Sequence, residues 1–194
     1  MKKLKRISLE LRQHIPFTLI ATLIAVILVF FIQKIDISKL FFVIHPLHIF
    51  TSAIVSSAIF YKYKKNFFQA LVVGVVSSIF IGTLSDIIFP YLGGIIFRLK
   101  TEFHLSLIEE PLIIFSISIF GGIVGIATKW TKFPHFSHVF LSVFASLFYL
   151  VAFSAITSVY HFILAFVIVF VAVLIPCCIS DIILPLLFLK RIMR

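Results

Sequence analysis

Two pairs of histidines share one spacing in this chain and could together bind an ion. His45 and His48 form the first His-x-x-His pair, and His135 and His138 form the second. Residues three apart lie on the same face of an α-helix, so each pair can turn two imidazole nitrogens toward one ligand. Serines continue each face further along the chain. One such pair alone is weak evidence for a site, whereas two pairs in matching surroundings are stronger evidence.

A six-residue phrase that contains an aspartate also occurs twice. Residues 85–90 read Ser-Asp-Ile-Ile-Phe-Pro, and residues 180–185 read Ser-Asp-Ile-Ile-Leu-Pro. Each phrase follows one of the histidine pairs, so each half of the chain supplies two histidines and one aspartate, Asp86 or Asp181. The surrounding sequence is almost wholly apolar. Ionisable groups at membrane depth are costly and usually mark a functional site.

The first set of residues has the composition of a site for a divalent transition metal. Imidazole nitrogen together with carboxylate oxygen suits Zn²⁺, Fe²⁺, Mn²⁺, Co²⁺ or Ni²⁺ better than Ca²⁺ or Mg²⁺. We expect His45, His48 and Asp86 to converge in the outer half of the membrane. Glu109 or Glu110 should approach them, although the pair of acids before a proline also fits an ordinary helix start.

The second set predicts a matching site in the inner half of the membrane. It consists of His135, His138 and Asp181. The sequence leaves open whether His14, Cys177 and Cys178 contribute to it. The serines and histidines of both sets have a plainer interpretation as hydrogen-bonding contacts between helices.

The elements that must position these residues are membrane-spanning helices. Of the 194 residues, 62% are hydrophobic and 12% are charged, and the mean hydropathy is +1.23. Because this composition cannot supply the polar surface of a soluble domain, it predicts an all-α polytopic membrane protein, with residues 1–194 as a single transmembrane domain. Six spans are expected, at roughly 15–33, 40–61, 66–90, 109–128, 136–158 and 162–188. Gly93 and Gly94, after Pro90, should end the third of them.

The positive charge fits membrane topology and gives no indication of nucleic-acid binding. The net charge of +10 comes from short basic clusters between apolar runs. With a cytoplasmic N-terminus, thirteen lysines and arginines fall on the cytoplasmic side and four on the other. This asymmetry predicts that both termini are cytoplasmic and, in a prokaryote, that the protein lies in the plasma (inner) membrane. The lipid bilayer is the expected partner, and the sequence leaves open whether the protein forms a homo-oligomer.

The repeated motifs divide the chain into two halves of three spans each. Residues of about 10–90 form the first half and residues of about 105–190 form the second. Three is an odd number, so the second half must enter the membrane from the opposite side. The sequence therefore predicts two inverted three-helix repeats, an architecture common among secondary transporters.

These features favour a small permease that binds and moves a divalent transition metal, or a solute coupled to protons through the same groups. Two alternatives belong to other classes. An intramembrane metalloenzyme would use the histidines and carboxylates to activate water, but the sequence has no His-Glu-x-x-His motif and no Ser or Cys nucleophile set with a base at useful spacing. A structural or haem-binding subunit would use the histidines as helix contacts or axial ligands. We assign no catalytic residue.

Overall fold

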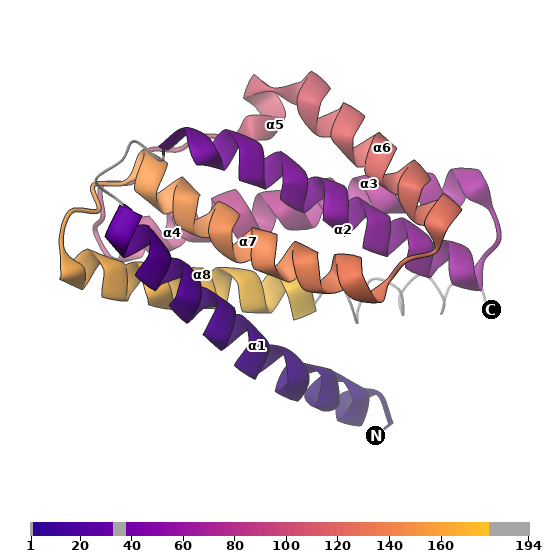
Figure 1. The fold of residues 1–194 in the computed structure, drawn as a ribbon, viewed down its shortest axis with the longest axis horizontal. Coiled ribbons are helices and arrows are strands. Elements are labelled where there is room, and N and C mark those ends of the chain that lie inside the picture. The colour runs from indigo at the N-terminus through magenta and orange to yellow at the C-terminus, as the bar shows by residue number, and fades with distance from the viewer. Residues whose placement is uncertain (1, 33–37, 179–194) are drawn as a thin grey trace.

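The computed structural model describes residues 2–32 and 38–178, apart from the side chains of residues 2–14, 38, 132–136 and 177–178. All the regular structure within these ranges is helical (Figure 1). The elements in chain order are α1 (Lys2–Ile32), η1 (Ser38–Leu40), α2 (Phe41–Tyr63), α3 (Phe67–Thr83), η2 (Leu84–Ile88), α4 (Phe89–Ile96), α5 (Ser106–Glu109), α6 (Pro111–Thr128), α7 (Lys132–Phe153) and α8 (Val159–Cys178).

The helical membrane class predicted from composition is confirmed at the level of length and hydropathy. Five segments are long and apolar enough to cross a membrane: Ile15–Ile32, Phe41–Tyr63, Phe67–Ile96, Pro111–Thr128 and Val159–Pro176. Each overlaps a predicted span, although the ends differ, as for Val159–Pro176 against the predicted 162–188. The predicted fifth span, 136–158, corresponds to a shorter apolar helix, Ser137–Phe153.

The third membrane segment is longer than predicted, because the helix stops neither at Pro90 nor at Gly93 and Gly94. The chain stays helical through α3, η2 and α4 as far as Ile96. Pro90 lacks an N–H group and so cannot bond the carbonyl of Asp86, four residues earlier. The turn between them, η2, is a π-helical turn in which the N–H of Phe89 bonds the carbonyl of Leu84. Widening the helix by one residue lets it pass the proline, and such π-bulges are frequent at functional sites.

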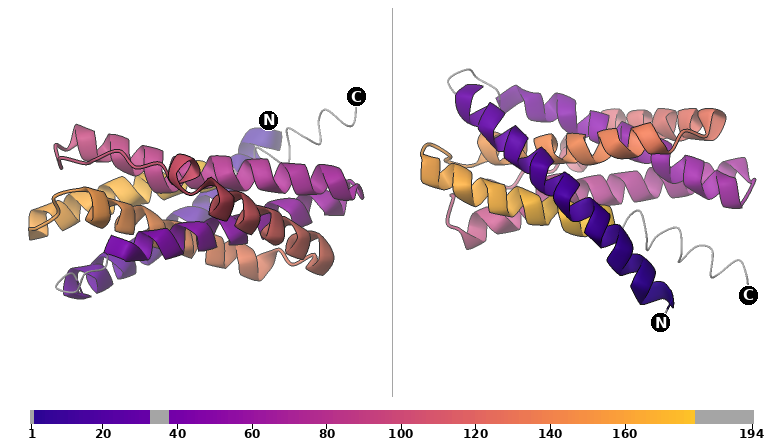
Figure 2. Two further views of the ribbon diagram at one scale, coloured as in Figure 1. Left: turned by 90° about the horizontal axis from the view of Figure 1, so that it is seen from above. Right: turned by 60° about the horizontal axis from the view of Figure 1, so that its bottom comes forward.

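Helix α2 lies at the centre of the bundle. It packs against α3, α6 and α7, while α8 packs against α1 and α7. Contacts also join α1 to α7 and α3 to α6, and η2 lies against α7 and α8. The views in Figures 1 and 2 agree that α2 and α7 run side by side in opposite directions. The centre of the molecule is therefore the contact between α2, α7 and the π-helical turn.

Glycines allow α2 and α6 to approach closely. A Cβ atom added at Gly121 would lie 2.5 Å from the carbonyl oxygen of Phe50, and one added at Gly125 would collide with the backbone of Ile54. Residues spaced as Gly-x-x-x-Gly on one helix face bring membrane helices into backbone contact in this way. The outer surface of the bundle is rich in exposed apolar side chains, such as Phe31 at 74% and Leu112 at 83% exposure, as expected for a protein whose solvent is lipid.

Candidate functional site

One carboxylate, Asp86, collects four hydrogen bonds at the centre of the bundle. Its Oδ2 atom lies 2.9 Å from Nδ1 of His45 and 2.6 Å from Nδ1 of His48. Its Oδ1 atom accepts hydrogen bonds from the hydroxyls of Ser85 at 2.7 Å and Ser142 at 2.9 Å. The predicted convergence of the first histidine pair with Asp86 is thus present in the structure.

A third imidazole extends this network from α7. Nε2 of His48 lies 3.3 Å from Nδ1 of His138, and the two rings stack with centroids 5.4 Å apart and planes 17° apart. An ionised Asp86 can only accept hydrogen bonds, so Nδ1 of His48 carries a proton and donates to it. In a neutral His48 the Nε2 atom must then be the acceptor, so Nδ1 of His138 donates to it. We call the four residues Asp86, His45, His48 and His138 the central cluster.

The central cluster is shielded from solvent. Asp86 and His48 are fully buried, and His45 and His138 are each 1% exposed. A buried charge is tolerated only when it is paired and hydrogen-bonded, and a partly satisfied polar network is worse than none. Both oxygens of Asp86 are satisfied, so the carboxylate can remain ionised among apolar helices.

The π-helical turn explains how Asp86 reaches both histidines. The turn puts Ser85 and Asp86 together on the side that faces α7. The hydroxyl of Ser146 fixes the turn there by donating to the carbonyl oxygen of Ser85 at 2.9 Å. On α2, the three-residue spacing of His45 and His48 puts both rings on one face. The local backbone therefore positions the site through features that are visible in the sequence: a proline after the turn and serines on α7.

Glu109, one of the two acids expected to approach this cluster, pairs with His104 instead. Glu109 lies 2.8 Å from Nδ1 of His104, and its side chain is 49% exposed. Glu110 is the residue at which α6 is capped. His104 stacks on Phe153 with centroids 4.4 Å apart and touches the edge of Phe41. No pattern in the sequence indicated a role for His104, because it lies in an irregular connection with no repeated motif around it.

Of the second predicted set, His135, His138 and Asp181, the structure describes only the side chain of His138. The side chain of His135 and the whole of Asp181 lie outside the described residues. His138, expected in a separate inner site, instead contacts His48 of the first set. The two sets were placed apart because their helices begin at opposite ends of the bundle. Both histidines lie about two turns inside their helices, where α2 and α7 cross.

The distances within the central cluster are those of hydrogen bonds. Ligand atoms around a tetrahedral Zn²⁺, at bonds of about 2.0–2.1 Å, are separated by about 3.3 Å. The contacts to Asp86, at 2.6 and 2.9 Å, are shorter than this. Across the described ranges, no three or more His, Cys, Asp or Glu side chains form a group that could hold a metal ion. A metal would have to open these hydrogen bonds to enter.

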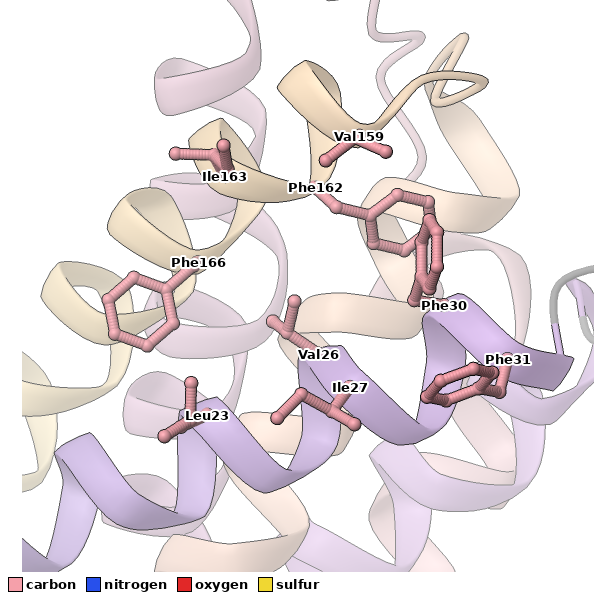
Figure 3. A pocket seen from close by; sticks show the side chains of 9 residues that line it. All are labelled: Leu23, Val26, Ile27, Phe30, Phe31, Val159, Phe162, Ile163 and Phe166. Carbon is pink, nitrogen blue, oxygen red and sulfur yellow. The ribbon is translucent and has the colours of Figure 1, made fainter.

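An apolar groove between α1 and α8 has no polar group with which to orient a ligand. It has a volume of about 480 Å³ and is lined by aliphatic and aromatic side chains only (Figure 3). Phe30 of α1 and Phe162 of α8 make an edge contact within this lining, with ring centroids 5.3 Å apart. Both helices are long and apolar enough to span a membrane, so the groove is suited to lipid chains and lies apart from the central cluster.

Comparisons of the chain with models of protein families, with curated proteins and with solved structures give no match.

Proposed function

We propose that this protein is a small proton-coupled permease and that the central cluster is its proton-binding site. The observation that carries the proposal is the sharing of one buried carboxylate oxygen by two imidazoles, with a third imidazole next in line. Chains of carboxylate and histidine at membrane depth are the usual means by which pumps and transporters carry protons. A purely structural contact between helices needs only one such hydrogen bond, whereas this cluster gathers four titratable groups.

The inverted repeat predicted from the sequence is part of this proposal, and the packing of the helices supports it. The repeat pairs α1 with α6, α2 with α7 and α3 with α8. If each helix is replaced by its counterpart, the packed pair α2 and α6 corresponds to the pair α7 and α1, which is also packed. The packed pair α2 and α3 corresponds in the same way to α7 and α8. The contact of α3 with α6 likewise becomes that of α8 with α1. Each of these packed pairs therefore has a packed counterpart, as a two-fold axis in the membrane plane requires.

The place of the histidines in this arrangement also favours transport. His48 and His138 are equivalent residues in the two repeats, and they contact each other. In alternating access, one repeat rocks against the other around a fixed site near the middle of the membrane. A proton held between His48 and His138 would lie on the surface between the two moving parts. Rocking can then expose it to either side of the membrane.

The pair of His104 and Glu109 offers a route by which protons reach the cluster from one end of the bundle. Glu109 is half exposed, His104 is mostly buried, and their side chains are 2.8 Å apart. Phe41, itself fully buried, lies between this pair and the cluster: it touches the ring of His104 and stacks on His45 at 5.2 Å. We propose that Phe41 is the gate between the exposed pair and the buried site.

Transport of a divalent transition metal is the second candidate function. Three imidazoles and a carboxylate are a donor set that Zn²⁺, Mn²⁺ or Fe²⁺ can use. Such an ion would compete with protons for the same nitrogen atoms, so its binding would weaken as the pH falls. The hydrogen bonds that now join these donors make the proton the better fit.

Proton movement in proteoliposomes tests the proposal. Vesicles that contain the protein and a pH-sensitive dye are given a potassium diffusion potential, and acidification of the lumen is followed with and without Mn²⁺ or Zn²⁺. Wild-type protein should admit protons, and Asp86→Asn should not. Glu102→Gln is the matched control, because Glu102 is an exposed acid outside the cluster. Equal rates for wild type and Asp86→Asn, in every condition, would exclude the proposed site.

A further inference from the structure

Lysines gather around a cavity at the end of the bundle opposite to His104. Here α2 and α6 end and α3 and α7 begin (Figure 1). The cavity measures about 450 Å³, many times the roughly 30 Å³ of one water molecule, and is lined by Ala58, Tyr61, Lys62, Lys65, Lys129 and Thr131. No acidic residue is among these lining side chains. Among the lining side chains that the structure describes, three lysines therefore have no carboxylate beside them to balance their charge.

The fold draws these lysines together from two separate connections. Gly125 brings α6 into backbone contact with α2 near Ile54, so the ends of the two helices stay close. Lys129 then ends α6 in the left-handed conformation, with φ of 56°, and its N–H bonds the carbonyl of Gly125 at 2.9 Å. Cations are favoured at the C-terminal ends of helices, which explains one lysine at each helix end. It does not explain why three of them line one cavity.

Aromatic residues indicate the depth of this cavity in a membrane. Tyr63 is 61% exposed and Trp130 is 63% exposed, and each is adjacent in sequence to a lysine that lines the cavity. Tyr and Trp concentrate where a membrane meets water, at the level of the lipid headgroups. The apolar segments Phe41–Tyr63 and Pro111–Thr128 also end at this point. The cavity is thus at the height where lipid phosphates lie.

We propose that this cavity binds the phosphate group of an anionic lipid. Lys62, Lys65 and Lys129 would supply ammonium groups to the phosphate oxygens, and the hydroxyls of Tyr61 and Thr131 would supply further donors. Basic pockets between membrane helices are suited to anionic headgroups. The predicted orientation, with basic connections in the cytoplasm, assigns the pocket to the cytoplasmic leaflet. The inference does not depend on what the central cluster transports.

Thermal unfolding of delipidated protein in detergent tests this site. The probes are a short-chain phosphatidylglycerol, a phosphatidylcholine of the same chain length, and inorganic phosphate. The variants are Lys129→Gln and the double variant Lys65→Gln/Lys129→Gln. Lys39→Gln is the matched control, since Lys39 is an exposed lysine at the other end of α2.

Phosphatidylglycerol should raise the melting temperature of wild type and of Lys39→Gln, and phosphatidylcholine should not. At about 1 kcal/mol for each lysine near an anionic headgroup, each substitution should weaken the affinity about fivefold. If inorganic phosphate stabilises the protein as much as phosphatidylglycerol does, the pocket binds a free phosphate anion and the proposal of a lipid ligand is wrong. Equal responses of wild type and the double variant, or equal responses to both lipids, would overturn the site itself.

Discussion

His48 and His138 are the second histidines of the two His-x-x-His motifs, and their rings stack against each other in the middle of the bundle. They are 90 residues apart and join through Nε2 and Nδ1 at 3.3 Å. Equivalent residues of two related units meet where a two-fold axis passes between the units. In the proposed inverted repeat, the contact between His48 and His138 lies at this axis. In the proposed permease it marks the point around which the two halves move.

Ser142 and Ser52 allow a matched test of the network around Asp86. Each lies seven residues after the first histidine of its His-x-x-His motif. The hydroxyl of Ser142 donates to Asp86, whereas that of Ser52 is buried without a hydrogen-bond partner. Loss of a hydrogen bond to a charged group costs about 1.5–3 kcal/mol. Ser142→Ala should therefore lower the free energy of unfolding by about this amount, and Ser52→Ala should change it little. Denaturation in mild detergent measures both, and equal losses would contradict the assigned network.

Phe41 should control chemical access to His45. Diethyl pyrocarbonate modifies imidazole nitrogen, and mass spectrometry identifies the modified histidine. In wild type we expect slow reaction at His45, because Phe41 covers its ring, and in Phe41→Ala a reaction at least several times faster. Phe41→Leu, which keeps most of the bulk, should give a smaller increase, with His138 protected in both variants. An unchanged rate at His45 in both variants would exclude Phe41 as the gate.

Helix α6 should tolerate a methyl group at Gly122, which faces a side chain of α3, and not at Gly125, which faces the backbone of α2. At Gly125 an added Cβ meets the backbone of Ile54, which cannot move aside, while at Gly122 it meets the end of the Leu71 side chain at 2.7 Å. Overpacking of a tight contact costs about 1–3 kcal/mol. Gly125→Ala should therefore lower the melting temperature clearly, and Gly122→Ala much less. The reverse order would mean that the two helices do not approach as described.

The repeat predicts that Asp181 matters to transport as Asp86 does, although Asp181 lies outside the described residues. Asp181→Asn keeps the size of the side chain and removes its charge. We expect this variant to lose proton movement in the vesicle assay while it keeps the melting temperature of wild type within a few degrees. If Asp181→Asn transported at the wild-type rate, the two halves would not be functionally equivalent, and Asp86 would act alone.

The predictable part of this molecule is the part that depends on hydropathy and short-range spacing. Uninterrupted apolar runs gave the spanning segments, and the His-x-x-His spacing put His45 and His48 on one face beside Asp86. The end of the third span was not predictable by the same means. Gly93 and Gly94 after Pro90 commonly end a helix, but a π-helical turn removes the strain of the proline and lets the helix continue.

The parts of the site that the sequence did not predict depend on where helices cross. The approach of His138 to His48 requires the crossing point of α2 and α7, which no local pattern specifies. The pairing of His104 with Glu109 depends on the path of an irregular connection. That path is fixed by contacts between residues distant in sequence, such as the hydrogen bond from the N–H of His104 to the hydroxyl of Tyr149 at 3.2 Å.

The most direct measurement of the central claim is the nitrogen NMR spectrum of the histidines, recorded as a function of pH on protein with ¹⁵N-labelled histidine. If Asp86 holds both His45 and His48, their Nδ1 atoms carry protons at neutral pH. Asp86→Asn then shifts both sets of resonances and changes the pH dependence of both, while His161, which lies outside the cluster, is unaffected. If His45 and His48 titrate independently, with curves that Asp86→Asn leaves unchanged, then the shared carboxylate does not form a proton-binding site and the account is wrong.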